Sequence, residues 1–332
     1  MNLKTNYLNL TLRSPVVVAA SPLSRSLDNI QRMEAGGAGA VVLYSLFEEQ
    51  IRIEQQLLRY FEDHPKASAE DALALFPGQS QFHTRMDEYL DHITQAKAAV
   101  SIPIIASINC RALGSWTDVA AKIEAAGADA LELNIYPISM NMQQSAEQIE
   151  SMFVTIVRIV KETVKLPVAV KLAPYFTNLA YMARRLDEAG VNGLVLFNRF
   201  YQPDLDPRTL ELRSDVPLSN PGDIRLPLHW IAALYGYLRA DLAATSGIYT
   251  AEDVIKLLMA GAKVTMVASA LFKDGLDALS TIDRDLRVWL DQNDYESVAS
   301  LQGILRQFHS KDPSTFERAQ YVRAVLEQKA KP

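Results

Sequence analysis

One lysine of this sequence stands where an uncharged residue is expected. Lys171 lies within the apolar run Val168-Ala169-Val170-Lys171-Leu172-Ala173. Because a lysine is almost never fully buried without a partner, we expect its ammonium group to face an anionic group. That group is either an electron-rich cofactor or the carbonyl of a substrate that forms a Schiff base with the amine. A side chain that extends past the strand end to solvent is the structural alternative.

Polar residues also end the other short apolar runs of the chain. One asparagine at such a place is often only a turn residue, but here three occupy equivalent positions, which favours a shared site. The polar residues at the ends of the runs are Ser21, Ser45, Asn109, Asn134, Lys171, Asn198, Ser246 with Gly247, and Ser269.

The last two of these runs end in small residues before a helical stretch. Thr245-Ser246-Gly247 and Ala268-Ser269-Ala270 are each followed by such a stretch. Free backbone N–H groups in front of a helix N-terminus bind phosphate, and barrel folds use the loops after their last two strands for this purpose. The pattern predicts a ligand with a terminal phosphate.

An internal repeat indicates which elements position these residues. A helical stretch ends in a small residue and glycine, and an apolar run follows, at residues 36–43, 126–133, 189–196 and 260–267. The glycine suits a left-handed helix C-cap, and the run suits a strand that is buried on both faces. Further runs at residues 15–18, 103–106 and 167–170 begin with proline, and residues 242–245 lie in the matching place without one. Eight strands that alternate with helices predict the α/β fold of a (β/α)8 TIM barrel, in which strand C-termini converge on one face.

Additions to this barrel are also predicted. Leu8, Leu10 and Leu12 alternate with polar residues, which indicates an N-terminal β-hairpin that covers the bottom of the barrel. Long βα-loop insertions at residues 47–89, at 197–226 and after Asn134 are expected on the active face as lids, and His83 lies in one of them. A doubly wound open sheet is the alternative, but no Gly-x-Gly-x-x-Gly follows the first strand. We expect one domain over residues 1–332.

Composition excludes several classes of partner. A formal net charge of -6 leaves no basic surplus for nucleic acid or an anionic membrane, and no signal peptide or membrane-spanning run is recognisable. We therefore expect a cytoplasmic protein. Cys110 is the only cysteine, so this chain alone supplies no disulfide, zinc knuckle or iron–sulfur cluster, and the five histidines show no metal-ligand spacing. No metal site is expected.

Several motifs together resemble the class 1 dihydroorotate dehydrogenase family, over nearly the whole chain. The segment from Leu8 to Ser21 is similar to its hairpin and first strand, and Leu131-Glu132-Leu133-Asn134 is similar to its fourth strand. Residues 167–174, PVAVKLAP, resemble its lysine-bearing strand, and residues 221–227 resemble the segment before its sixth helix.

The resemblance implies a flavin mononucleotide (FMN) on the top face of the barrel. By that correspondence Ala20 and Ser21 contact the isoalloxazine ring, Ser45 and Asn134 form hydrogen bonds with it, and Asn198 lines the substrate side. The charge of Lys171 would favour the anionic reduced flavin at the pyrimidine end of the ring. The phosphate would be held by Ser246, Gly247, Ala268 and Ser269. Asn109 and Ser219 complete the implied set of FMN-binding residues.

Three departures from the family pattern are visible. Tyr44 occupies the place of a lysine that usually precedes the serine after the second strand, and no asparagine-rich substrate loop is recognisable between Phe76 and Tyr89. Pro137 falls where the family has its catalytic cysteine or serine. Ser139 or Tyr136 is expected to substitute, although a tyrosine with a pKa of about 10 is a poor base at neutral pH.

These observations predict an FMN-dependent oxidoreductase of dihydroorotate dehydrogenase type. It would oxidise a dihydropyrimidine-like CH–CH substrate, and it would convert dihydroorotate to orotate in pyrimidine biosynthesis if the family activity is retained. The resemblance also implies a soluble electron acceptor or redox partner and a homodimer. Two alternatives stay open: a Schiff-base lyase or aldolase that uses Lys171, and a flavin-binding protein without dehydrogenase activity.

Overall fold

The computed structural model describes residues 1–50, 86–110, 116–137, 139–213 and 216–307, with single positions at 56, 60, 63–64, 322 and 325–327; for Cys110 it describes only the backbone. Within these residues, no helix has both the length and the apolar composition that a membrane crossing requires. The loop at residues 76–83 and its His83, considered above as part of a lid, lie outside the described residues.

Eight parallel strands close into a barrel, as the sequence predicted. The strands are β3 (Val16–Val18), β4 (Ala40–Val42), β6 (Ile104–Cys110), β7 (Ala130–Ile135), β8 (Val168–Leu172), β9 (Gly193–Leu196), β12 (Asp241–Thr245) and β13 (Val264–Val267). The ring is complete because β13 pairs with β3 and β4 pairs with β6. A two-residue strand, β5 (Leu46–Phe47), pairs with β6 beyond the point where β4 ends. The (β/α)8 TIM barrel is confirmed, and the open-sheet alternative is wrong.

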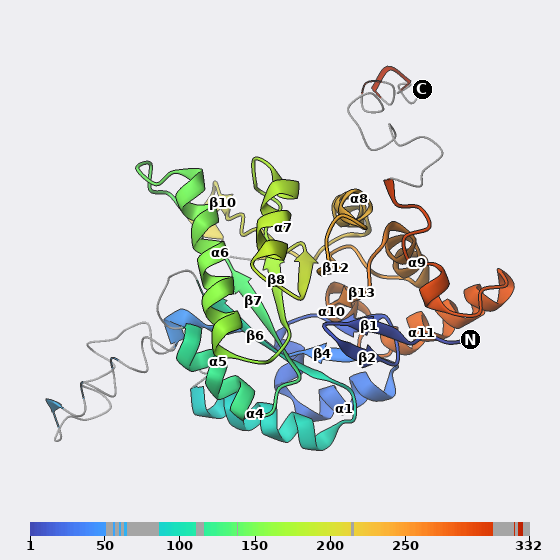
Figure 1. The fold of residues 1–332 in the computed structure, drawn as a ribbon, viewed down its shortest axis with the longest axis horizontal. Coiled ribbons are helices and arrows are strands. Elements are labelled where there is room, and N and C mark those ends of the chain that lie inside the picture. The colour runs from blue at the N-terminus through green and yellow to red at the C-terminus, as the bar shows by residue number, and fades with distance from the viewer. Residues whose placement is uncertain are drawn as a thin grey trace.

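Helices surround the barrel (Figure 1). They are α1 (Leu27–Ala35), α4 (Met86–Ala99), α5 (Trp116–Ala125), α6 (Ala146–Thr163), α7 (Leu179–Glu188), α8 (Arg225–Leu234), α9 (Ala251–Ala260), α10 (Ser269–Asp274) and α11 (Ala278–Gln292), with 3-10 turns η1 (Pro22–Arg25), η3 (Pro221–Ile224) and η4 (Val298–Ser300). A glycine from each of the four repeats has positive φ, namely Gly37, Gly127, Gly190 and Gly261. The repeat was therefore interpreted correctly as helix termination followed by a strand.

The barrel interior is filled from below by the N-terminal hairpin, β1 (Thr5–Tyr7) and β2 (Leu10–Leu12). Tyr7 and Leu8 are fully buried in one apolar cluster with the inward side chains of the strands. The Leu8 amide donates to Asp241 Oδ2 at 2.9 Å, which fixes the hairpin turn at the first residue of β12. Small residues give the hairpin room: Ala40, Ala130, Ala169, Gly193 and Ala243. The predicted N-terminal hairpin is confirmed.

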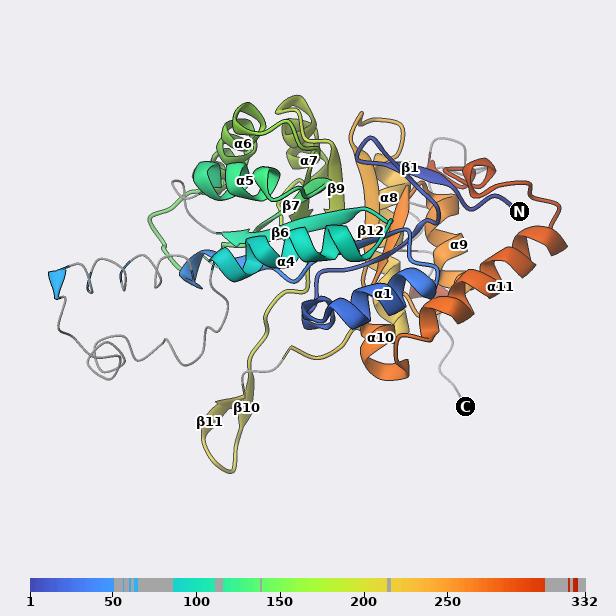
Figure 2. The ribbon, with the colours of Figure 1, turned by 90° about the horizontal axis from the view of Figure 1, so that it is seen from below.

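The long connection after β9 carries a second hairpin, β10 (Asp204–Asp206) paired with β11 (Glu211–Arg213). Figure 2 shows that this hairpin stands away from the barrel. Its leucines at positions 205, 210 and 212 are 66% to 88% exposed and belong to neither apolar cluster of the described residues. The segment is an insertion on the face where the strands end.

Gly193 generates a prediction about hairpin docking. A Cβ atom at this position would lie 2.8 Å from Leu8 Cδ2 and 3.3 Å from Tyr7 Cε2. We expect Gly193→Ala to lower the free energy of unfolding by about 1–3 kcal/mol, the usual cost of overpacking. Urea denaturation measures this change. The effect of Gly193→Ala should shrink in a Leu8→Ala background, because the collision is then removed; equal effects in both backgrounds would contradict this account.

Candidate active site

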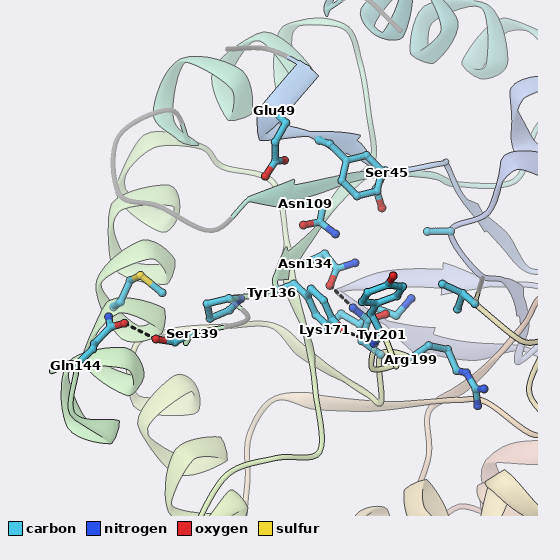
Figure 3. Close-up of a pocket in the computed structure, with 16 residues that line it drawn as sticks. Ser45, Glu49, Asn109, Asn134, Tyr136, Ser139, Gln144, Lys171, Arg199 and Tyr201 are labelled. Carbon is cyan, nitrogen blue, oxygen red and sulfur yellow. Dashed lines mark hydrogen bonds between the residues drawn. The ribbon is translucent and has the colours of Figure 1, made fainter. Parts of the chain in front are cut away.

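Three asparagines and Lys171 form the floor of a cavity at the carboxyl ends of the strands. Strand register aligns Asn109 with Asn134, and Asn134 with Lys171, across β6, β7 and β8. Asn198 follows β9 and donates from Nδ2 to Asn134 Oδ1 at 2.8 Å. Figure 3 shows Asn109, Asn134 and Lys171 close together. The pattern of polar residues at strand ends therefore identified side chains that converge.

The cavity above this floor has a volume of about 810 Å³. Most of the residues proposed from the sequence line it: Ala20, Ser45, Asn109, Asn134, Tyr136, Ser139, Lys171 and Asn198. Pro137, which takes the place of the family's catalytic cysteine or serine, lines it as well. The volume is within the range of cavities that bind a cofactor or drug-sized molecule.

A smaller cavity of about 120 Å³ adjoins the first and shares Ala20, Lys171 and Asn198 with it. Its other lining residues from the predicted set are Ser219, Ser246, Gly247, Ala268 and Ser269. Hydroxyl and backbone N–H groups of this kind suit a phosphate. The two cavities together have the polar character that a planar ring with a phosphate at one end requires.

A hydrogen-bonded cluster holds the walls of the smaller cavity together. Ser219 Oγ donates to Ser269 Oγ at 2.8 Å and accepts from the Gly247 amide at 3.1 Å. The backbone turns sharply here, because Ser246 and Gly247 both have positive φ, 83° and 73°. A Cβ atom on residue 247 would lie 2.3 Å from the amide nitrogen of Ile224, so only glycine fits.

Ser21 is the exception among the proposed residues. It lines neither of these two cavities, and its side chain is buried with an Oγ that has no hydrogen-bond partner among the described residues. The structure thus places Ser21 directly after Ala20 without bringing its hydroxyl into the cavity wall. A contact between this hydroxyl and a ligand stays a prediction.

A polar layer lies in the barrel beneath the floor. Lys171 Nζ is 3.7 Å from Glu132 Oε1, and both side chains are buried, 8% and 1% exposed. Ser107 Oγ donates to the same carboxylate oxygen at 3.4 Å, and Ser45 Oγ lies 2.8 Å from Ser107 Oγ. Sequence reasoning missed Glu132, although it is, like Lys171, a charged residue inside an apolar run. The ammonium group has the anionic partner that its burial demands.

Tyr89 of α4 supports this layer from outside the barrel. Its hydroxyl accepts from the Ser107 amide at 2.9 Å and donates to the Ser107 carbonyl at 3.1 Å. The backbone of Ser107 has no strand partner on this side, because β4 pairs with β6 only as far as Ile105 and β5 pairs with β6 only from Ile108. Burial raises the pKa of Tyr89 far above its ordinary value, so the hydroxyl remains protonated. A side chain thus replaces the missing strand partner.

Tyr44 belongs to the same outer layer. Its ring contacts Tyr89 edge-on with centroids 5.2 Å apart, and the Arg25 guanidinium lies 4.5 Å from its ring centroid. It packs in the apolar cluster that includes Tyr89 and Ile93 of α4 and does not line the 810 Å³ cavity. The side chain that stands where the family has lysine therefore contributes packing.

Tyr136 and Ser139, the two candidates for proton transfer, have different surroundings. The Tyr136 hydroxyl accepts from the Tyr201 amide at 2.6 Å, and the residue is half-buried. Ser139 is exposed and donates to Gln144 Oε1 at 2.8 Å. In Figure 3 Ser139 and Gln144 lie to one side, well away from Lys171.

Sequence reasoning missed other residues of the cavity wall. Glu49, Gln144, Arg199 and Tyr201 line it, and Arg199 Nη1 lies 2.8 Å from Asp223 Oδ2. Arg199 and Tyr201 follow β9 in the long connection at residues 197–226. The sequence of this connection has no periodic pattern that would show which side chains face inward. Cys110 also ends β6, but its side chain lies outside the described residues.

The bonds between Tyr89 and Ser107 generate a second prediction. Tyr89→Phe would leave the amide and carbonyl of Ser107 without this partner in a buried place, and we expect a loss of about 1–3 kcal/mol in the free energy of unfolding. Tyr181→Phe on α7, where the ring is 47% exposed, is the matched control and should change stability little. Similar unfolding midpoints in urea for the two variants would rule out the role given to Tyr89.

Comparison with known proteins identifies the relatives of this chain. A family model described as "Dihydroorotate dehydrogenase" matches residues 2–290. A protein of Aeropyrum pernix, provisionally named dihydroorotate dehydrogenase A (fumarate), is 31% identical over 64% of this chain and 70% of its own length.

Two further relatives are named dihydroorotate dehydrogenase B (NAD(+)), catalytic subunit. That of Methanothermobacter thermautotrophicus is 25% identical over 91% of this chain and 98% of its own length. That of Methanocaldococcus jannaschii is 25% identical over 84% of this chain and 90% of its own length. The closed barrel, the convergent strand ends and these matches agree: the chain belongs to the dihydroorotate dehydrogenase family.

Proposed function

We propose that this protein is an FMN-dependent oxidoreductase of dihydroorotate dehydrogenase type that acts on CH–CH groups. The observation that carries the proposal is that the two cavities are adjacent and share lining residues. A floor of asparagines and one paired ammonium group adjoins a serine-lined space that suits a phosphate. Family membership supports the same assignment.

The chain's own residues fit FMN at both ends of the molecule. Ser219, Ser246, Gly247, Ala268 and Ser269 would hold the phosphate. Ala20, Ser45, Asn109, Asn134 and Lys171 would contact the ring, and Asn198 would face the substrate. Bound FMN would supply hydride transfer to or from a carbon of the substrate.

The Glu132 carboxylate bears on the choice between two roles for Lys171. A Schiff-base nucleophile has to have its amine free to reach a substrate carbonyl, whereas Lys171 Nζ lies 3.7 Å from Glu132 Oε1 in a buried ion pair. The pairing therefore supports a cationic residue that stabilises negative charge on the ring, and it argues against a lyase or aldolase.

Tyr136 is the residue that we propose for proton transfer to or from the substrate. The Tyr201 amide donates to its oxygen at 2.6 Å and so holds the hydroxyl in place, and the residue lines the cavity. Ser139 has no base beside it among its described contacts, since its hydroxyl donates to the Gln144 amide oxygen.

The substrate and partners follow from the same proposal. A dihydropyrimidine-like compound would bind above the floor, and dihydroorotate is the compound in the names of the relatives. A soluble electron acceptor or redox partner would reoxidise the cofactor in the cytoplasm, within pyrimidine biosynthesis if that substrate is correct. A homodimer is part of the proposal, and the exposed leucines of the β10–β11 hairpin support a second copy.

The phosphate site generates a third prediction. Purified protein should show the two visible flavin bands or acquire them with added FMN. FMN should bind more tightly than riboflavin, and Ser269→Asp should weaken FMN at least tenfold, about 1.4 kcal/mol, because it places a carboxylate against the phosphate. Ser280→Asp on the exposed face of α11 is the control. Fluorescence titration measures both ligands.

Other outcomes of this experiment have defined meanings. Equal affinities for FMN and riboflavin would remove the phosphate assignment. A colourless protein that takes up no flavin but forms a borohydride-trapped adduct on Lys171 would replace the oxidoreductase with a lyase.

Proton transfer generates a fourth prediction. Under anaerobic conditions dihydroorotate should bleach the flavin, and Tyr136→Phe should slow bleaching by about 10²–10⁴-fold, the range for loss of general acid–base catalysis. Ser139→Ala should leave the rate within a few fold of the wild-type value. Stopped-flow absorbance measures the rates. The reverse order would move the role to Ser139. A wild-type flavin that dihydroorotate does not reduce would exclude this substrate and favour another, or a flavin protein without dehydrogenase activity.

A further inference from the structure

The ion pair of Glu132 with Lys171 is unusual in its place. Both residues project from neighbouring strands into the barrel, and the register pairs Glu132 with Ala169 and Asn134 with Lys171. The carboxylate thus lies one layer below the amine, between the apolar interior and the cavity floor. A buried carboxylate is costly, and hydrophobic residues would fill the space at lower free energy. Its presence therefore calls for a role.

Glu132 forms an ion pair with one described cation, Lys171. Among the described residues, Lys171 is the cation that pairs with it, and Ser107 donates to the same oxygen. The second oxygen, Oε2, is buried without a hydrogen-bond partner in the described part of the chain. Tyr7 approaches from below, and its pKa is raised by burial and by the charges of Glu132 and Asp241, so it remains a neutral phenol. The negative charge of Glu132 therefore partly offsets the positive charge of Lys171 at the cavity floor.

We propose that Glu132 is a positioning residue that holds Lys171 at the floor of the cavity and, by offsetting its charge, sets the reduction potential of bound FMN. The inference rests on the proposed function. Two electrons and one proton convert oxidised FMN to a reduced form that carries one more negative charge on the ring. Lys171 stabilises that charge, and Glu132 reduces the stabilisation. The carboxylate thereby keeps the bound flavin a stronger reductant.

The experiment measures the midpoint potential of wild-type protein loaded with FMN, by dithionite titration against a reference dye. Glu132→Gln keeps the shape and removes the charge. We expect reduced FMN to gain affinity relative to oxidised FMN by on the order of tenfold, as for a unit charge several ångströms away at an effective dielectric constant of about 20. For a two-electron couple this corresponds to a potential about 30 mV more positive.

Three further variants separate this role from a structural one. Glu132→Asp retains the charge and should keep most of the wild-type midpoint potential. If Glu132→Gln does not fold, this variant still tests whether the charge at position 132 sets the potential. Glu124→Gln is the matched control, because this α5 carboxylate accepts from the Lys165 and Leu166 amides before β8, far from the cavity. In a Lys171→Met background the shift from Glu132→Gln should become much smaller, because the amine that the carboxylate holds in place and offsets is then absent.

The outcomes are distinct. Wild-type protein that does not bind FMN overturns the proposed function, and the inference falls with it. Wild-type protein that binds FMN, with a potential that Glu132→Gln leaves unchanged or makes more negative, overturns only the role of Glu132. The same holds if the shift persists at full size without Lys171, because Glu132 would then act independently of the amine.

Discussion

The limited interior of an eight-stranded barrel is the constraint on which the other features of this protein depend. Inward side chains from all strands share one narrow space, so each layer must be filled without overlap. The lower layers are apolar and small, and the hairpin residues Tyr7 and Leu8 complete them. The layer of Ser107, Glu132 and Lys171 is where apolar packing ends. Charge is tolerated there because the two opposite charges are adjacent and a hydroxyl satisfies part of the carboxylate.

The same constraint explains why much of the architecture could be predicted from the sequence. Glycines such as Gly127 and Gly190 mark helix ends through a backbone conformation that other residues avoid, and the apolar runs after them have nowhere to lie except in a buried sheet. Parallel strands then bring their polar ends together. Lys171 was found because a charge in an apolar run is improbable, and the same argument applied to Glu132 would have predicted the pair.

Other parts of the site could not be read from the chain. The Tyr89 phenol lies on an amphipathic helix, where tyrosine is ordinary, and its partners are backbone atoms of a strand whose pairing changes at that point. Arg199 and Tyr201 lie in a connection without regular periodicity, so their direction depends on contacts with distant segments. Ser21 is the opposite case: the sequence pattern predicted it as a site residue because it follows a strand, but its hydroxyl does not line the cavity.

The residues at the floor of the site and the residues around it have different surroundings. Asn134, Lys171 and Asn198 line one cavity, whereas Tyr44 packs toward α4 and Pro137 has no proton to donate. Tyr44 contacts the helices outside the barrel, and Pro137 lies in the wall of the cavity. Specificity can diverge at such positions while the strand register stays fixed.

The N-terminal hairpin has a consequence for how the molecule assembles. Residues 5–12 leave the ribosome before any barrel strand exists, yet Thr5 donates to the Lys263 carbonyl and Leu8 to Asp241, more than two hundred residues later. The base of the barrel therefore stays unsealed until the last two strands have been synthesised. Contacts of such high sequence separation slow folding, and nascent chains expose apolar surface in the meantime. Closure of the ring and docking of its first segment thus both require the last two strands.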